Sequence, residues 1–153
     1  MADQPQPTLS IPTVTLLAER PLTTYTDRNQ ITCPDDAVEI VRPLVTGVDR
    51  EIGVVISLDN QHRVIAVDTV SIGSAQHTFF APREVMRTVL HRGASAYFVA
   101  HNHPSGDPTP SPDDRAITTR LHRAGELVGV DLLDHVVLGD SDAWTSLARL
   151  GVI

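Results

Sequence analysis

One stretch of the chain decides the fold: residues 94–114 read ASAYFVAHNHPSGDPTPSPDD. Its first third, residues 94–100, is apolar and contains two aromatic residues and a valine, which predicts a short buried strand. Residues 104–110 are rich in Pro and Gly and predict a loop. Ser111 then suits a helix N-cap and Pro112 suits the first helical position, so a helix is expected to begin here.

The rest of the chain predicts helices and strands around this stretch. We expect further strands at residues 13–18, 51–58, 63–72 and 128–138, and helices beginning at residue 34 and spanning 82–91, 111–127 and 142–150. Pro43 is expected to end the first helix early or to kink it, because proline lacks the N–H donor. The order of elements indicates an α/β fold in which helices cover a mixed β-sheet.

Composition limits the function classes. A length of 153 residues fits one domain of ordinary size, and the formal net charge of −7 disfavours a general nucleic-acid binder. All 12 basic residues are arginines spread along the chain, and the absence of lysine excludes a P-loop NTPase. Cys33 is the one cysteine, which excludes a disulfide framework and a metal site made of cysteines alone.

The N-terminal sequence Met1-Ala2-Asp3-Gln4 is acidic and lacks an apolar core, so we expect no signal peptide. The sequence has no run of 18 apolar residues, and we therefore expect no membrane span. These features favour a soluble cytoplasmic protein. We expect residues 1–30 to form an extension with a possible strand, and the oligomeric state is not predicted.

His101, His103 and Asp114 form the candidate metal site. Residues two apart in an extended segment point to the same side, so both imidazoles can face one point. The first turn of the next helix can bring Asp114 back over the strand end. Two imidazoles and a carboxylate leave a fourth zinc position open for water, whose pKa zinc lowers to about 7. We therefore expect one Zn²⁺ per chain and hydrolytic chemistry.

Simpler interpretations exist for each part of this pattern. Ser111 caps a helix in many proteins, a His-X-His pair is often exposed to solvent, and four prolines indicate only a stiff loop. The conjunction of all three favours a metal site. Two His and one carboxylate also bind iron in oxygenases, but usually in the reverse order. A zinc deaminase would need a Pro-Cys-X-X-Cys motif, which one cysteine cannot supply.

The spacing His101-X-His103-Pro104, seven residues, then Ser111-X-X-Asp114 resembles the JAMM (MPN+) metalloprotease motif. The longer sequence around this motif resembles the bacterial RadC branch of that superfamily. Pro82-Arg83-Glu84 and the segment Leu133-Asp134-His135-Val136-Val137 add to this resemblance. It covers about residues 31–153, which we take as one RadC-like JAB/MPN+ domain.

The resemblance implies a cytidine-deaminase-like (JAB/MPN) sandwich and a zinc metallopeptidase that acts on peptide or isopeptide bonds. It implies that His101, His103 and Asp114 are the zinc ligands. Glu51 occupies the place of the family's general acid/base, and Ser111 that of the serine that stabilises the oxyanion. Position alone would make Glu51 only an acid at a strand edge.

Two departures from the family pattern keep the substrate open. RadC proteins usually carry a helix-hairpin-helix region that is associated with DNA, and we expect it to be absent from the polar residues before the first helix. The chain also has little room for the insertions that grip ubiquitin in JAMM deubiquitinases. A peptide, an isopeptide or a small amide could be the substrate. The alternative is a scaffold or DNA-repair-associated protein with little peptidase activity.

Four polar residues near the site have structural interpretations. We expect His135 to be a core histidine hydrogen-bonded to the backbone, with the alternative that Asp134 and His135 orient a ligand imidazole. Asp107 is expected to form a turn. Asn102 is expected to point away from the two histidines and to make structural hydrogen bonds.

Overall fold

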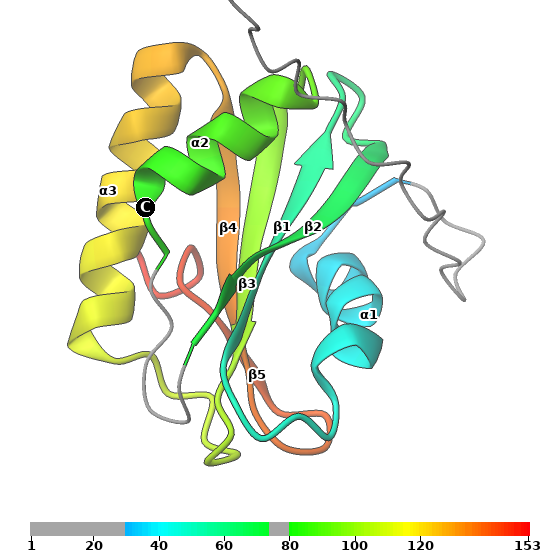
Figure 1. Ribbon diagram of the computed structural model, residues 1–153, viewed down its shortest axis with the longest axis vertical. Coiled ribbons are helices and arrows are strands. Elements are labelled where there is room, and N and C mark those ends of the chain that lie inside the picture. The colour runs from blue at the N-terminus through cyan, green and yellow to red at the C-terminus, as the bar shows by residue number, and fades with distance from the viewer. Residues whose placement is uncertain (1–29, 74–79) are drawn as a thin grey trace, which may run out of the picture.

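The computed structural model describes residues 30–73 and 80–153 (Figure 1). The elements are α1 Pro34–Val45, β1 Ile52–Leu58, β2 Val64–Ile72, α2 Pro82–His91, β3 Ala96–Asn102, α3 Pro112–Val128, β4 Asp131–Leu138 and β5 Trp144–Ser146. The strand predicted at residues 13–18 lies outside the described residues. Among the described residues, no helix combines the length and apolar character needed to cross a bilayer.

A five-stranded sheet in the order β2-β1-β3-β4-β5 forms the centre of the domain. β3 and β4 are parallel and are joined through α3, whereas the other neighbouring strands are antiparallel. Helix α1 covers one face of the sheet, and α2 and α3 cover the other (Figure 1). This confirms the predicted α/β class with a mixed sheet between helices. The crossover places the start of α3 beside the carboxyl end of β3.

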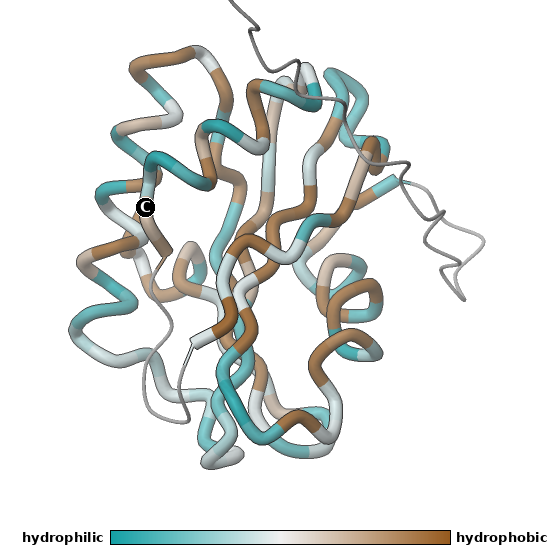
Figure 2. Tube along the Cα trace, viewed as in Figure 1, coloured by the Kyte–Doolittle hydropathy of each residue, from teal (hydrophilic) through white to brown (hydrophobic). Residues whose placement is uncertain are grey.

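Each face of the sheet has its own hydrophobic core, and Figure 2 shows apolar residues concentrated in the strands between the helices. The core under α1 contains Val54, Ile56, Leu58, Phe98, Ala100, Val136 and Leu138. The core under α2 and α3 contains Val55, Val85, Val89, Tyr97, Val99, Leu121 and Leu132. Because β3 side chains alternate between the faces, His101 belongs with Tyr97 and Val99 on the α2–α3 side.

Helix α1 begins as its sequence predicts and ends later than expected. The Asp36 carboxylate accepts hydrogen bonds from the backbone N–H groups of Thr32 and Cys33, at 2.7 and 3.1 Å, which holds the chain that enters the helix. The helix runs past Pro43 to Val45, so the predicted early end is wrong. A proline near the C-terminus removes only one backbone hydrogen bond of the last turn, and packing of the helix compensates.

The end of the chain contradicts the closing helix predicted at residues 142–150. Residues Trp144–Ser146 instead form β5, which pairs antiparallel with β4. Three residues rich in aromatic and β-branched side chains fit a strand, and the edge of β4 supplies the hydrogen-bond partners that a short isolated helix lacks.

Strand β3 also lies two residues later than predicted, at Ala96–Asn102, so that His101 stands within it.

Candidate metal centre

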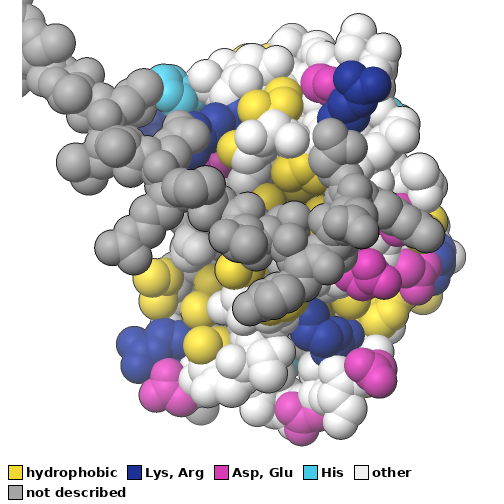
Figure 3. Space-filling model, turned by 90° about the vertical axis from the view of Figure 1, so that its right-hand side faces the viewer, with side chains coloured by type: hydrophobic (Ala, Val, Ile, Leu, Met, Phe, Trp, Pro, Cys, Tyr) yellow, Lys and Arg dark blue, Asp and Glu magenta, His cyan; other side chains and the backbone are white. Residues whose placement is uncertain are grey.

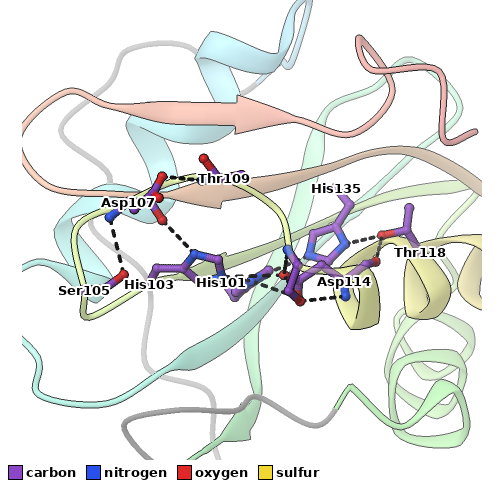
Figure 4. A network of polar contacts seen from close by, with 9 residues as sticks. His101, His103, Ser105, Asp107, Thr109, Asp114, Thr118 and His135 are labelled. Atoms are coloured by element: carbon purple, nitrogen blue, oxygen red, sulfur yellow. Dashed lines mark hydrogen bonds and ion pairs between the residues drawn. The ribbon is translucent and has the colours of Figure 1, made fainter.

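Two imidazoles and a carboxylate meet where β3 ends and α3 begins (Figure 4). The Nε2 atom of His101 lies 3.1 Å from Nε2 of His103 and 3.2 Å from Oδ1 of Asp114. The Nε2 atom of His103 lies 3.6 Å from Oδ2 of Asp114. The structure thus brings together the three residues that the sequence pattern selected as ligands.

These distances fit a zinc ion. Four-coordinate zinc binds His nitrogen and carboxylate oxygen at about 2.0–2.1 Å, and tetrahedral angles then separate neighbouring ligand atoms by about 3.3 Å. The His101–His103 distance of 3.1 Å and the His101–Oδ1 distance of 3.2 Å lie close to that value, and His103 lies 3.6 Å from Oδ2, the other oxygen of the same carboxylate. Donor identity and spacing therefore both suit Zn²⁺, with His101, His103 and Asp114 as the residues that would hold it.

The loop between the ligands is fixed by backbone contacts. The N–H of His103 donates to the Leu138 carbonyl at 2.8 Å, which extends the β3–β4 ladder to the ligand. Gly106 has φ +83 and its carbonyl accepts from the Asp140 N–H at 3.0 Å. A Cβ at Gly106 would lie 2.2 Å from a carboxylate oxygen of Asp140, so this close approach requires glycine.

Arg42 connects α1 to the same part of the molecule. Its guanidinium donates to the carbonyls of Gly139, Ser141 and Ala143 in the turn between β4 and β5. That turn packs directly on the ligand loop, because a Cβ at Gly139 would lie 2.3 Å from the Gly106 carbonyl oxygen. The position of the loop is therefore supported from the opposite side of the sheet.

The charges of the site favour a cation. Burial opposes ionisation of the Asp114 carboxyl, but its short contacts with the His101 and His103 imidazoles outweigh burial and hold its pKa well below the usual range. The contact with Asp114 raises the pKa of His103, against burial and with smaller contributions from the Asp107 carbonyl and Glu51. Asp114 is thus ionised at neutral pH, and its negative charge faces two imidazole nitrogens.

Glu51 is buried immediately before β1, with 8% of its surface exposed. Gly53 pairs with His101 in the antiparallel β1–β3 ladder, so Glu51 stands opposite His103 in the continued register. Asn102 holds this segment: its side chain accepts from the Ile52 N–H at 2.8 Å and donates to the Arg50 carbonyl at 3.1 Å. The predicted structural role of Asn102 is confirmed, and it fixes the backbone on both sides of Glu51.

Ser111 caps α3 and contacts a ligand at the same time. Its hydroxyl donates to Oδ2 of Asp114 at 2.6 Å and accepts from the Asp114 N–H at 3.1 Å. The Ser111 N–H also donates to the same carboxylate oxygen, at 2.7 Å. The reciprocal bonds form a capping box that orients Asp114 toward the histidines. In this arrangement the serine hydroxyl faces the ligand carboxylate.

Phe80 closes one side of the site. Its ring packs edge-on against His101 and His135, with centroid distances of 5.8 and 5.4 Å. Gly53 makes room for it, since a Cβ there would lie 2.6 Å from a ring carbon of Phe80. The ring, 4% exposed, separates the buried imidazoles from solvent. The sequence pattern did not indicate these contacts, because Gly53, His101 and His135 lie far from Phe80 in the sequence.

His135 is a site residue that the sequence analysis assigned to the core. It is fully buried, as expected, but its partners are side chains: Nε2 lies 2.8 Å from Nδ1 of His101, and Nδ1 lies 2.6 Å from Oγ1 of Thr118 (Figure 4). The expected backbone partner is therefore wrong. Thr118 was missed entirely; its place seven residues after Ser111, two turns along the helix, was the available signal.

Asp134 faces away from the metal site. Its carboxylate accepts from the N–H groups of His135 and Ala148, at 2.7 and 2.9 Å, and from the Ser146 hydroxyl at 2.5 Å. These bonds attach β5 and the chain after it to β4.

Asp107 forms the predicted turn, because its side chain accepts from the Thr109 N–H at 2.9 Å.

Charged side chains of both signs lie on the visible part of the face that carries α1. Figure 3 shows arginines in separate places there, interspersed with acidic side chains. On α3, Arg115, Arg120 and Arg123 are exposed to solvent. A surface of mixed charge offers no continuous path for a phosphate backbone.

Comparisons with known proteins agree on one family. A family model described as "RadC-like JAB domain" matches residues 31–152. A UPF0758 protein of Desulforamulus reducens is 41% identical over 123 residues, which cover 80% of this chain and 54% of the relative. UPF0758 proteins of Caldanaerobacter subterraneus and Geobacillus thermodenitrificans are 39% and 41% identical over 119 and 129 residues.

The matched region is most of this chain but only part of each relative. It covers 78% and 84% of the chain against 51% and 57% of the second and third relatives. The chain thus spans about half the length of the curated relatives that it matches. The name UPF0758 states no activity.

Proposed function

The chain belongs to the RadC-like JAB domain family, and from that premise we propose that it is a zinc-dependent hydrolase of amide bonds, of the JAMM peptidase type. The observation that carries the proposal is the convergence of His101, His103 and Asp114 at distances of 3.1–3.6 Å. When bound there, zinc supplies a Lewis acid and a water molecule with a pKa near 7. Three protein ligands leave one position for that chemistry.

Glu51 is proposed to hold and transfer the proton. Its carboxylate is buried at the strand end opposite His103, where a proton taken from the attacking water can pass to the leaving amine. The Asn102 side chain fixes the backbone on both sides of it. A general base depends on such positioning relative to the reacting atoms.

Ser111 is proposed to donate a hydrogen bond to the oxygen that becomes negative when the amide carbonyl is attacked. Its hydroxyl now donates to Asp114, so it must rotate toward the substrate for this role. This rotation does not leave the Asp114 carboxylate without a donor from Ser111, because the Ser111 N–H still donates to it at 2.7 Å.

The substrate class is proposed as peptides, isopeptides or small amides, with one Zn²⁺ per chain. The mixed surface charge and net charge of −7 do not favour the alternative of a DNA-binding protein. Retention of all three ligand residues does not favour a scaffold that has lost its metal.

The test is cleavage of a panel of quenched peptides and of peptides joined through a lysine ε-amine. We expect cleavage that chelation abolishes and added zinc restores. Glu51→Gln should lower kcat by about 100-fold to 10,000-fold with zinc content unchanged, because it removes the proton acceptor. Glu39→Gln, at an exposed position on α1, is the matched control. Cleavage that survives chelation, or that Glu51→Gln leaves intact, would contradict the proposal.

A further inference from the structure

A chain of hydrogen bonds leads from the ligand His101 into helix α3 (Figure 4). The Nδ1 atom of His101 lies 2.8 Å from Nε2 of His135. On its other side, Nδ1 of His135 lies 2.6 Å from Oγ1 of Thr118, which lies 2.5 Å from the main-chain carbonyl oxygen of Asp114. The chain therefore begins and ends on metal-site residues, since the Asp114 side chain faces His101.

The direction of these bonds follows from the last acceptor. A main-chain carbonyl can only accept, so the single hydrogen of the Thr118 hydroxyl is directed to Asp114. The Thr118 oxygen is then left to accept from His135, which must carry its proton on Nδ1. A neutral imidazole protonated on Nδ1 has a bare Nε2, and this nitrogen accepts from Nδ1–H of His101.

His135 has the burial needed for this arrangement. It is completely buried. A neutral His101 whose Nε2 is free for a metal carries its proton on Nδ1, so Nε2 of His135 is the acceptor in the bond between them. Phe80 packs against both imidazoles and keeps water from offering another partner. Within residues 30–73 and 80–153, the hydrogen-bond partners of the His135 ring nitrogens are the side chains of Thr118 and His101.

We propose that His135 and Thr118 are positioning residues that hold His101 in the tautomer protonated on Nδ1, with Nε2 bare and directed to the metal. The inference rests on the proposed function, since it assumes that His101 is a ligand. Neither residue belongs to the group of three candidate ligands. A ligand histidine whose second nitrogen donates to a fixed acceptor binds metal more tightly, because its tautomer and orientation are set in advance.

In His103, the second proposed ligand, a single backbone acceptor favours the same tautomer. Nδ1 of His103 lies 2.8 Å from the Asp107 carbonyl oxygen, an obligate acceptor in the ligand loop. His101 stands inside β3, where backbone carbonyls already serve the sheet ladders. The partner of its Nδ1 is a side chain instead, that of His135 on the neighbouring strand.

The test compares zinc affinity in two threonine variants of α3. Thr118→Val removes the hydroxyl and keeps the shape, and should weaken zinc binding by about 10-fold to 100-fold in competition with a chromogenic chelator. Thr119→Val is the matched control, because its hydroxyl likewise donates to the carbonyl four residues earlier, that of Arg115, at 3.1 Å. Thr118→Ser restores the hydroxyl and should restore affinity. Equal affinity of Thr118→Val and Thr119→Val would overturn the inference.

A second measurement needs no variant. Ring ¹⁵N spectra of the zinc-bound wild-type chain, labelled at histidine, should show His135 neutral and protonated on Nδ1. A signal for protonation on Nε2, or for an imidazolium, would overturn the inference even if Thr118→Val failed to fold. A purely structural role for Thr118 would lower thermal stability and leave both the zinc affinity and the tautomer unchanged.

Failure of the inference and failure of the proposed function are separable. A wild-type chain that binds no zinc would overturn both. A wild-type chain that binds zinc and cleaves amides, with Thr118→Val equal to wild type in zinc affinity, would overturn the inference alone.

Discussion

Two buried polar clusters share strand β4 and lie on its opposite faces. The Asp134 cluster consists of Asp134, Ser146 and the N–H groups of His135 and Ala148. The histidine cluster consists of His101, His103, Asp114, Thr118 and His135. Both contain an aspartate with little exposed surface at the edge of a hydrophobic core.

The clusters differ in how their hydrogen bonds end. In the Asp134 cluster, both carboxylate oxygens accept from protein donors, so its charge is satisfied within the chain. In the histidine cluster, the proposed tautomers leave Nε2 of both imidazoles without a hydrogen, and these nitrogens lie 3.1 Å apart beside the Asp114 carboxylate. The first arrangement stabilises the fold, whereas the second suits a cation. An aspartate that faces hydrogen-bond donors, as Asp134 does, stabilises the fold. An aspartate that faces other acceptors, as Asp114 does, suits metal binding.

The largest expected effect is a loss of zinc affinity when Asp114, the aspartate of the histidine cluster, is replaced. Asp114→Asn should weaken zinc binding by about 100-fold to 1000-fold, because a structural zinc site contributes on the order of 3 kcal/mol per ligand. Asp113→Asn, one residue earlier and exposed, is the control and should bind zinc like wild type. Isothermal titration measures both. Wild-type affinity in Asp114→Asn would remove Asp114 from the ligand set.

A substitution in the Asp134 cluster should affect stability rather than zinc affinity. Asp134→Ala should lower the free energy of unfolding by about 3 kcal/mol, because buried donors are left without an acceptor. Zinc affinity of the folded fraction should stay near wild type. Urea unfolding of the zinc-free protein, followed by zinc titration, checks both statements. A loss of zinc affinity as large as that of Asp114→Asn would show that the two clusters are coupled.

Gly53→Ala should disturb the wall of the histidine cluster. The added Cβ would lie 2.6 Å from the Phe80 ring, and displacing the ring should cost about 1–3 kcal/mol of stability. The same substitution in a Phe80→Ala background should cost clearly less, since the clash is gone. Additive costs in the double variant would mean that the ring is not the obstacle.

The smallest expected effect concerns Asp36, a carboxylate that resembles Asp134 in accepting from backbone N–H groups and a side-chain hydroxyl. The backbone hydrogen bond from Thr32 holds its pKa below the usual value, against desolvation. A lowered folded-state pKa contributes stability that is present above about pH 4 and is lost as pH falls through the folded-state pKa. Asp36→Asn should remove about 1 kcal/mol near neutral pH and flatten the acid limb of the stability profile. An unchanged acid limb would contradict this assignment.

Local sequence signals predicted much of the fold. The bounds of α2 are as expected, and Ser111 and Pro112 start α3 where the capping pattern places them. The three candidate ligands meet because their positions depend on a strand end and one helical turn, both of which are local. These elements follow from hydrophobic periodicity and capping alone.

Contacts between distant segments could not be predicted in this way. A β-bulge between β3 and β4 pairs Tyr97 with Leu132 and Phe98 with Asp134, so one residue of β4 is skipped. The bulge decides which face receives Asp134 and which receives His135. Likewise, β5 replaces the expected helix because β4 and the Asp134 carboxylate offer partners that a local pattern does not contain.

The central claim is that the histidine cluster is a metal site, and elemental analysis of the purified chain tests it most directly. Wild type should contain about one zinc per chain and His103→Ala none, because two remaining ligands do not retain the ion. His91→Ala, at an exposed position on α2, should keep its zinc. Wild type without zinc after zinc has been supplied, or His103→Ala with a full equivalent, would contradict the account.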